Sequence, residues 1–253
     1  MINKIEDIIK DAGILAQSLL TDDLEIHNKS AQDWVTNIDI TIEKFLVENI
    51  LKVMPEANFL AEENTHNTKG SDHLFIIDPI DGTTNLIHQK QNFAISVAYY
   101  HQSQPQYGFV FDVMGDKLYK GISGDRAYLN GVPFSPNKNR RNEPLKNGLL
   151  FGDIYRKDLF KKPYDDIKSY IAAHRFLGSC AIEICEVAFE KAHAYVFPKI
   201  TIWDGAAALI ILKCTGGTWY FDNEIEGYPL NDKKSIMIAC LNDSVLQELL
   251  QWI

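Results

Sequence analysis

Residues 74–88, LFIIDPIDGTTNLIH, form an apolar run that is broken by two carboxylates, a proline, a glycine and two threonines. A short apolar run that ends in turn residues is typical of a buried strand. Asp78 and Asp81 therefore flank a predicted tight turn directly after such a strand. Because the ends of a β-turn lie within about 7 Å of each other at Cα, both carboxylates can reach one shared space. The fold must accommodate two neighbouring acids at the edge of its core.

This turn has two interpretations. Asp-Pro and Asp-Gly are common turn dipeptides, so a simple chain reversal would explain Pro79 and Gly82. A reversal would not explain two acids, whose like charges repel each other unless a cation lies between them. Carboxylate and carbonyl oxygens are the ligands that Mg²⁺ prefers, and the backbone N–H groups of 82–84 could hold a phosphate. From this segment alone, a turn and a metal–phosphate site both remain open.

Two distant stretches supply further carboxylates. Glu62 and Glu63 end the predicted strand FLAEENT, where a solvated acidic strand end is the alternative interpretation. Asp204 immediately precedes the apolar helix pattern GAAALIILK, where a helix N-cap is the alternative. The capping and metal-binding roles of Asp204 are compatible with each other. The sequence therefore offers acids from three separate regions for one site.

The first half of the chain combines two helices with a series of strands. Apolar residues three or four apart predict helices over 2–19 and 38–54. Short apolar runs between turn dipeptides predict strands over 58–63, 74–78, 93–101, 106–114, 116–122 and 126–131. Their spacing favours an antiparallel meander over βαβ units.

The second half alternates helices and strands. We expect strands over 149–153, 193–197, 218–222 and 235–240, and helices over 158–173, 179–191, 205–213 and 244–253. The polar segment 134–148 is the predicted connection between the halves. The fold class is α+β passing into α/β, with helices layered on two sheets. We expect one domain, 1–253, with 1–134 and 148–253 as its sub-lobes.

Composition excludes several classes of function. The formal net charge of −9 disfavours nucleic-acid and anionic-membrane surfaces, which reward clustered Lys and Arg. No apolar run approaches the roughly 20 residues of a membrane helix, and the N-terminal segment lacks the continuous apolar core of a signal peptide. The cysteines show no zinc-ligand spacing and fit reduced thiols. P-loop, HExxH and GxSxG motifs do not occur. We expect a cytoplasmic protein.

The chain resembles a known family at the same residues. Glu62-Glu63, the segment DPIDGTTN over 78–85, and the segment WDGA over 203–206 occur in the order found in the inositol monophosphatase family of lithium-sensitive, magnesium-dependent phosphatases. Segments 29–39 and 174–185 extend the resemblance. It implies an αβαβα layered sandwich of the inositol monophosphatase / fructose-1,6-bisphosphatase type, a homodimer, and hydrolysis of phosphate monoesters with two to three Mg²⁺ ions per site.

The resemblance also implies roles for individual residues. Glu62, Asp78 and the carbonyl of Ile80 would bind the first Mg²⁺. Asp78, Asp81 and Asp204 would bind the second, and a third ion would rely on Glu62 and water.

The remaining roles concern water, phosphate and substrate. Thr83 paired with Asp39 would orient and deprotonate the attacking water, with Glu62 as the third catalytic residue. The N–H groups of Gly82 and Thr83 would hold the phosphate. Gly178 and Ser179 would approach the alcohol portion of the substrate. The implied mechanism is in-line attack by a metal-activated water, without a phosphoenzyme.

The substrate is left open by the sequence. Inositol-selective members carry an acid several positions before the Trp-Asp pair, where this chain has Phe197. A phenyl ring accepts no hydrogen bond from a hydroxyl, so strict inositol specificity is in doubt. We expect a small phosphorylated polyol or sugar such as inositol 1-phosphate. Fructose 1,6-bisphosphate, NADP and 3′-phosphoadenosine nucleotides are alternatives, and a metal-binding interaction protein with the same fold is the non-enzyme alternative. The complete acidic set favours an enzyme.

Overall fold

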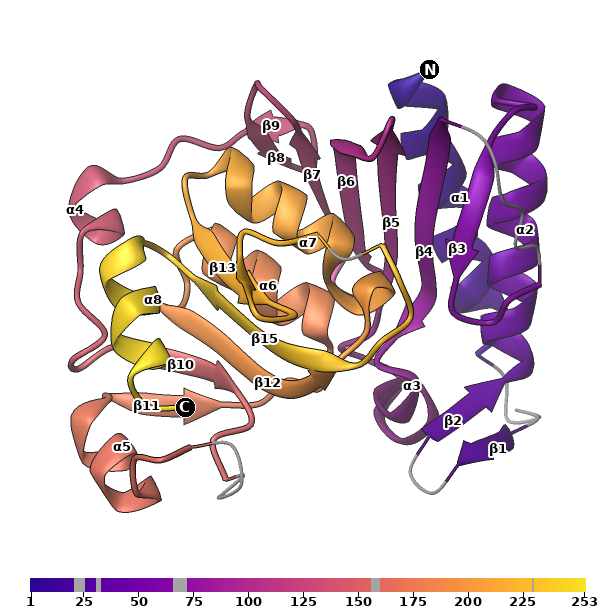
Figure 1. Ribbon diagram of the computed structural model, residues 1–253. Coiled ribbons are helices and arrows are strands. Elements are labelled where there is room, and N and C mark those ends of the chain that lie inside the picture. Colours follow the sequence, from indigo (N-terminus) through magenta and orange to yellow (C-terminus); the bar gives the residue numbers. More distant parts are fainter. Residues whose placement is uncertain (21–25, 31–32, 66–71, 156–159, 229) are drawn as a thin grey trace.

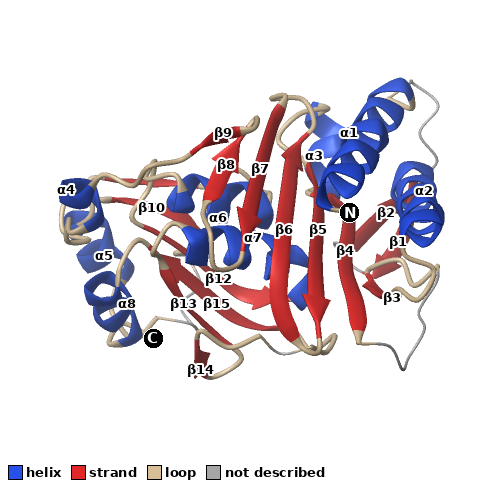
Figure 2. Cartoon of the chain, turned by 90° about the horizontal axis from the view of Figure 1, so that it is seen from above, coloured by secondary structure: helices blue, strands red, loops and turns tan. Residues whose placement is uncertain are grey.

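The computed structural model describes residues 1–20, 26–30, 33–65, 72–155, 160–228 and 230–253. Two β-sheets alternate with three layers of helices (Figure 1). Viewed from above, two helices lie between the sheets, and further helices cover the outer faces (Figure 2). This order of layers confirms the predicted αβαβα sandwich.

The first outer layer consists of α1 (Ile2–Ser18) and α2 (Asn37–Val53), as predicted. Both helices bury an apolar face, with Ile9 and Ile42 completely inaccessible, against one side of the larger sheet. Thr36 caps α2, and its side chain and Asp39 form a reciprocal capping box. Burial of apolar surface therefore fixes α2, and the box fixes its first turn.

The larger sheet has seven strands in the order β3-β4-β5-β6-β7-β8-β9. Their bounds are Asn58–Ala61, His73–Asp81, Ala94–His101, Gln104–Asp112, Lys117–Ile122, Ala127–Leu129 and Val132–Pro133. From β4 to β9 every neighbour is antiparallel, which confirms the meander. The pairing of β3 with β4 is parallel, so the meander prediction is wrong for this first pair. The connection between these two strands is longer than a hairpin turn, and a parallel pair requires such a return.

The middle layer consists of α6 (Cys180–Ala188) and α7 (Ile202–Cys214). Residues of both helices and both sheets form one buried cluster, so α7 is apolar around most of its circumference. A helix that is hydrophobic all round is buried on all sides. The runs CAIEIC and AAALIIL therefore occupy the centre of the molecule.

The smaller sheet has the order β11-β10-β12-β15-β13-β14. Its strands span Ala173–Arg175, Leu149–Gly152, Ala194–Ile200, Ser235–Cys240, Thr218–Phe221 and Glu224–Ile225. Helices α5 (Tyr164–Tyr170) and α8 (Asp243–Leu250) cover its outer face. The helix predicted over 158–173 is shorter than expected because the chain returns as β11, and 158–159 lie outside the described residues.

Several short elements were not predicted, and three of them lie close to the start of α2 and the end of β4. Strands β1 (Ile26–Ser30) and β2 (Asp33–Thr36) form a small antiparallel pair before α2. Helix α3 (Thr83–Gln89) follows β4, where the sequence suggested only a turn. Each is too short to show its own apolar period, so its conformation depends on neighbouring parts of the chain.

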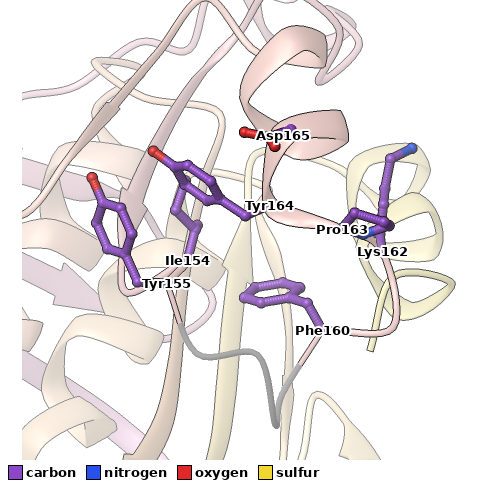
Figure 3. A pocket seen from close by; sticks show the side chains of 7 residues that line it. All are labelled: Ile154, Tyr155, Phe160, Lys162, Pro163, Tyr164 and Asp165. Carbon is purple, nitrogen blue, oxygen red and sulfur yellow. The ribbon is translucent and has the colours of Figure 1, made fainter.

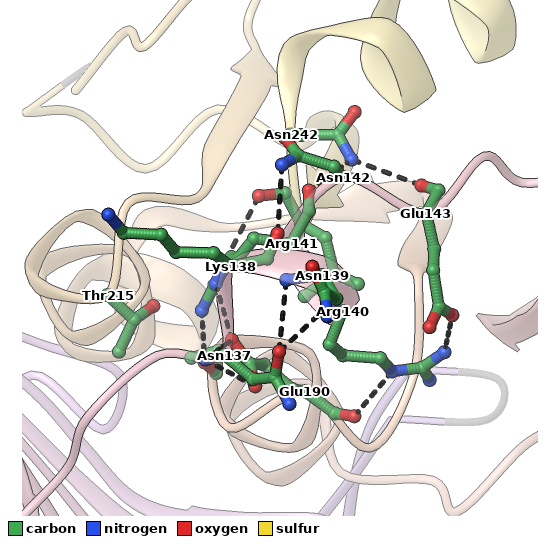
Figure 4. Close-up of polar contacts among 12 residues, drawn as sticks. Asn137, Lys138, Asn139, Arg140, Arg141, Asn142, Glu143, Glu190, Thr215 and Asn242 are labelled. Carbon is green, nitrogen blue, oxygen red and sulfur yellow. Dashed lines mark hydrogen bonds and ion pairs between the residues drawn. The ribbon is translucent and has the colours of Figure 1, made fainter.

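The predicted polar connection, 134–148, contains the short helix α4 (Lys138–Arg141). The guanidinium of Arg141 is nearly buried and donates to a carboxylate oxygen of Glu190 at 3.0 Å and to the carbonyl of Leu241 at 3.1 Å (Figure 4). The side chain of Asn242 donates to the carbonyl of Arg141 at 2.7 Å. The connection is therefore fastened to α6 and to the start of α8.

Gly108 allows α7 to lie directly on the larger sheet. A Cβ atom at this position of β6 would come within 2.3 Å of the carbonyl oxygen of Ala207. We predict that Gly108→Ala lowers the free energy of unfolding by about 3 kcal/mol, because overpacking displaces backbone rather than a flexible side chain. Urea denaturation measures the loss. The control is Gly131→Ala, which meets nothing within 4 Å and bears only the left-handed φ of +77°. Equal losses in both variants would contradict the close-packing argument.

Candidate metal centre and active site

The parallel pairing of β3 with β4 brings the first two acids together. Ala61 lies opposite Ile77, and the amide of Glu62 donates to the carbonyl of Ile77 at 3.1 Å. Glu62 is thereby held beside Asp78 on the neighbouring strand. Had the pair been antiparallel, the end of β3 would lie at the opposite edge of the sheet.

The segment DPID is a β-bulge and not the predicted tight turn. Strand β4 continues through Asp81, with Asp78 opposite Ser96 and Asp81 opposite Ala94. Three steps along β4 therefore oppose two along β5, and the amide of Ile80 donates to Oδ1 of Asp78 at 3.0 Å. A bulge re-aims side chains locally. It lets two acids of one strand point into the same region.

The third acid comes from the start of α7. Thr201 is the N-cap of this helix, and Oδ2 of Asp204 accepts from the amide and the hydroxyl of Thr201 at 2.8 and 2.7 Å. Asp204 therefore occupies position N3 of α7 and completes a capping box with Thr201, and it is not itself the N-cap. One ligand atom each from Glu62, Asp78 and Asp204 lie within 4.8 Å of one another. Acids from three regions of the chain thus meet at one point.

Burial and like charge raise the pKa of three aspartates in this region. Asp78 is almost inaccessible, and its pKa is well above the usual range because of burial and then the charges of Glu62, Asp81 and Asp204. Burial, and then the charge of Asp81, raise the pKa of Asp204 to about 7. Burial is also the main cause that raises the pKa of Asp81 to about 6. Bound cations would relieve this crowding.

Asp81 lies next to this cluster but is turned toward α6. Its carboxylate accepts the hydroxyl of Ser179, the amide of Ala181 at 2.7 Å and the amide of Cys180 at 3.2 Å. The positive end of the helix dipole favours a carboxylate at this place. The geometry thus groups three of the four predicted acidic ligands. Binding of Mg²⁺ by Asp81 stays a prediction.

Thr83 and Asp39 lie within hydrogen-bonding distance. The hydroxyl of Thr83 is 2.9 Å from Oδ1 of Asp39 and 3.1 Å from the carbonyl oxygen of Ile80. Oδ2 of Asp39 accepts from the amide of Thr36 at 2.9 Å. Burial raises the pKa of Asp39, and the hydrogen bonds oppose this. The two residues predicted to handle the attacking water are therefore adjacent and rigidly oriented.

The predicted phosphate and substrate residues lie side by side. Gly82 has φ +97°, which favours glycine, and a Cβ there would come within 3.2 Å of the carbonyl oxygen of Gly178. The side-chain amide of Asn85 donates through Nδ2 to the carbonyl of Leu177 at 2.7 Å and to that of Asn92 at 2.8 Å. Asn85 therefore fastens the loop before Ser179 to the start of α3.

Two buried glutamates in this region were missed by the sequence reasoning. Glu43 accepts from the amide of Glu63 and the amide of Thr65, both at 2.7 Å, and so fixes the segment that follows Glu62. Glu183 accepts from the amides of Leu177 and Gly178, and burial raises its pKa to about 8. The signal for Glu43 was its position one helical turn after Asp39. Nothing local marks Glu183.

A separate cavity of about 420 Å³ lies between β10 and α5 (Figure 3). Its lining includes Tyr155, Phe160 and Tyr164 but none of the predicted site residues. Aromatic rings form much of the lining of this cavity, and the acidic cluster lies elsewhere.

Within the described ranges, every helix falls short of the length and apolar character that a bilayer span requires.

Known proteins share the fold and the sequence pattern. The family model described as the inositol monophosphatase family matches residues 1–250. Inositol-1-monophosphatase of Bacillus subtilis is 32% identical over 245 residues, which cover 94% of this chain and 90% of that protein. Fructose-1,6-bisphosphatase/inositol-1-monophosphatase of Aquifex aeolicus is 33% identical over 199 residues, covering 77% and 74%. A structure of staphylococcal SaIMPase-II with bound 2′-AMP has a TM-score of 0.78 and 29% identity, covering 97% and 91%.

The contacts of Glu43 generate a prediction about metal affinity. We expect Glu43→Gln to weaken Mg²⁺ binding about 10–100-fold, because an amide replaces one acceptor oxygen with a donor and loosens the segment next to Glu62. Mg²⁺ titration followed by calorimetry measures the change. The matched control is Glu48→Gln on the exposed side of the same helix. Unchanged Mg²⁺ affinity in Glu43→Gln would contradict the positioning role.

The raised pKa values generate a prediction about pH. Asp81 and Asp204 hold protons more tightly in the folded chain than in the unfolded one. The free energy of unfolding therefore falls as pH rises from the usual aspartate pKa of 3.8 to the raised values of about 6 and about 7. With a chelator present, the free energy of unfolding should drop by about 2–4 kcal/mol between pH 5 and pH 8. Added Mg²⁺ should restore most of it at pH 8 and little at pH 5. Chemical denaturation at both pH values checks this, and a pH-independent Mg²⁺ effect would contradict it.

Proposed function

The chain belongs to the inositol monophosphatase family, and from this premise we propose that it is a Mg²⁺-dependent phosphomonoesterase of small phosphorylated polyols or sugars, such as inositol 1-phosphate. The observation that carries the proposal is the meeting of Glu62, Asp78 and Asp204 within 4.8 Å. Thr83 directly follows the end of β4 at the start of α3, and its hydroxyl donates to Asp39 in the first turn of α2.

The donor set fits Mg²⁺. The grouped residues offer carboxylate oxygens only, without histidine or thiolate, as hard cations require. Glu62, Asp78 and the carbonyl of Ile80 would hold one ion, and Asp78, Asp81 and Asp204 a second. When bound, Mg²⁺ supplies positive charge that offsets the phosphate charge and lowers the pKa of a nearby water. Burial and the neighbouring carboxylates raise the pKa of Asp78, and a bound cation would favour its ionised form.

Thr83 and Asp39 would orient the attacking water. The hydroxyl of Thr83 donates to Asp39, so the lone pairs of Thr83 are left to accept a hydrogen bond from water, and a proton taken from that water would be balanced by transfer of the hydroxyl proton to Asp39. Asp39 is buried and fixed by the capping box, which holds this orientation. Attack would then occur in line with the leaving alcohol.

The phosphate and the alcohol would bind on opposite sides of Gly82. The N–H groups of Gly82 and Thr83 lie at the start of α3 and would donate to phosphate oxygens. Gly178 and Ser179 face them from the second half of the chain and would contact the alcohol. This arrangement supports in-line displacement without a phosphoenzyme.

Two observations keep other substrates in view. The Aquifex aeolicus relative carries fructose-1,6-bisphosphatase in its name, and SaIMPase-II has been solved with 2′-AMP. Fructose 1,6-bisphosphate, NADP and 3′-phosphoadenosine nucleotides are therefore the alternatives. The non-enzyme alternative, a metal-binding interaction protein with the same fold, would use the three grouped acids but would not need the hydrogen-bonded pair of Thr83 and Asp39 beside them. We also propose that the protein acts in the cytoplasm as a homodimer. We propose no nucleic-acid partner, because a net charge of −9 disfavours binding to an anionic polymer.

Phosphate release tests the proposed function. Purified protein is assayed with inositol 1-phosphate, fructose 1,6-bisphosphate, NADP and 3′-phosphoadenosine 5′-phosphate, with Mg²⁺ or with a chelator. We expect release that requires Mg²⁺ and is inhibited by Li⁺. Absence of release from every substrate in the presence of Mg²⁺ would refute the enzyme proposal.

Asp78→Asn should separate activity from stability. The amide retains an oxygen for the amide of Ile80 but removes one charge from the cluster. We predict a loss of at least about 100-fold in kcat/KM. We also predict higher thermal stability in the presence of a chelator, because a buried like-charge repulsion is removed. The control is Asp116→Asn, which changes an exposed acid. Retained activity in Asp78→Asn would contradict the role of Asp78 as a metal ligand.

A further inference from the structure

A pair of stacked phenyl rings lies at the rim of the second half of the chain. The ring centroids of Phe176 and Phe197 are 6.0 Å apart with an interplanar angle of 11°. Phe197 is also stacked on the buried Tyr195, with centroids 6.5 Å apart and an angle of 6°. The row runs from the core to solvent, because Tyr195 is 1% exposed and Phe176 is 57% exposed. Offset-stacked rings at these distances form a stable flat surface.

The strand side of this row leads to the metal cluster. Phe197 of β12 lies directly opposite Met237 of β15, so both side chains occupy the same face of the sheet. The methyl group of Met237 would lie 2.6 Å from a Cβ atom at Gly205. Since Gly205 follows Asp204, this face of the sheet is turned toward the start of α7. The bulge after Phe197 further supports its placement next to a site.

The loop side of the row leads to the predicted alcohol-binding residues. Phe176 precedes Gly178 by two residues, so their Cα atoms are at most about 7 Å apart. Gly178 approaches Gly82, and Ser179 donates to Asp81. The amides of Leu177 and Gly178 are held by Glu183, so this short loop is fixed relative to α6. Phe176 therefore stands on an ordered loop that adjoins the leaving-group side of the site.

The chemistry of this rim is unusual for recognition of a polyol. The two rings offer carbon faces and no hydrogen-bond acceptor. A planar heteroaromatic ring gains from such a surface, because base–aromatic stacking is strong and tolerates different bases. A saturated polyol would meet the rings only through its C–H groups, and its hydroxyls would find no hydrogen-bond partner there.

We propose that Phe176 and Phe197 form an aromatic shelf on which the nucleobase of a phosphorylated nucleoside stacks while its ribose phosphate lies at the acidic cluster. This inference rests on the proposed Mg²⁺-dependent phosphatase activity and favours the nucleotide alternative over a polyol at the same site. Phe176 is the specificity-determining residue, and Phe197 positions its ring. The shelf acts on binding of the leaving group and leaves the chemical step to the acidic cluster.

The test compares a substrate with a base and one without. The kcat/KM values for 2′-AMP and inositol 1-phosphate are measured with Mg²⁺, and their ratio is taken for each variant. We expect Phe176→Ala to lower the ratio at least about fivefold, chiefly through a higher KM for 2′-AMP. Phe176→Trp, which retains a flat ring, should restore the ratio. Phe197→Ala should lower it in the same direction.

The control and a second readout make the outcome decisive. Val132→Ala removes an equally exposed apolar side chain on β9, at the far edge of the larger sheet, and should leave the ratio unchanged. In saturation-transfer NMR, the adenine protons of 2′-AMP should receive saturation from aromatic protein protons, and Phe176→Ala should remove most of this transfer.

The failures of the two proposals are distinguishable. An unchanged ratio in Phe176→Ala, or hydrolysis of inositol 1-phosphate without hydrolysis or binding of 2′-AMP, would overturn the shelf and leave the phosphatase intact. If neither these two substrates nor fructose 1,6-bisphosphate, NADP and 3′-phosphoadenosine 5′-phosphate are hydrolysed, the phosphatase proposal fails. The NMR transfer then still decides whether adenine binds at Phe176.

Discussion

Mutual repulsion of buried carboxylates is the constraint on which the rest of this structure depends. Glu62, Asp78 and Asp204 are held within 4.8 Å of one another, and Asp78 is almost inaccessible to solvent. Such an arrangement costs free energy at neutral pH unless protons or cations compensate for it. The surrounding layers must therefore stabilise the acids firmly enough to resist their separation. The parallel β3–β4 pair and the burial of α7 between two sheets provide this rigidity.

Helices hold the loops of the site through carboxylates that are not themselves grouped at the cluster. On α2, Asp39 holds Thr83, and Glu43, one turn later, holds the segment after Glu62. On α6, Glu183 holds the loop that contains Gly178. Each contact joins a rigid helix to a backbone amide or hydroxyl beside the cluster. Functional groups placed by such supporting contacts keep their geometry when loops would otherwise move.

The sequence predicted what is encoded within one contiguous segment. Helices α1 and α2, the meander from β4 onward and the acidic motif at the end of β4 each show a local pattern in the sequence. The bulge in DPID, helix α3 and the direction of β3 were missed, because a one-residue difference in register or a parallel return has no local signature. The contact of Asp81 with the start of α6 joins residues about 100 positions apart. Only packing of the complete chain reveals it.

The two sheets contribute different parts of the candidate site. The DPIDGTTN motif lies on only one of these parts, and so it does not identify the substrate. The larger sheet, with the start of α7, supplies the grouped acids and leads into Thr83, all within or near recognisable patterns. The smaller sheet and the loop before α6 would supply the proposed leaving-group side, where Phe176 and Phe197 come from separate elements and meet through stacking. The chemistry is therefore fixed by charge crowding, which tolerates little variation. The leaving-group side is built from a loop and a strand end that can change without disturbing the acids.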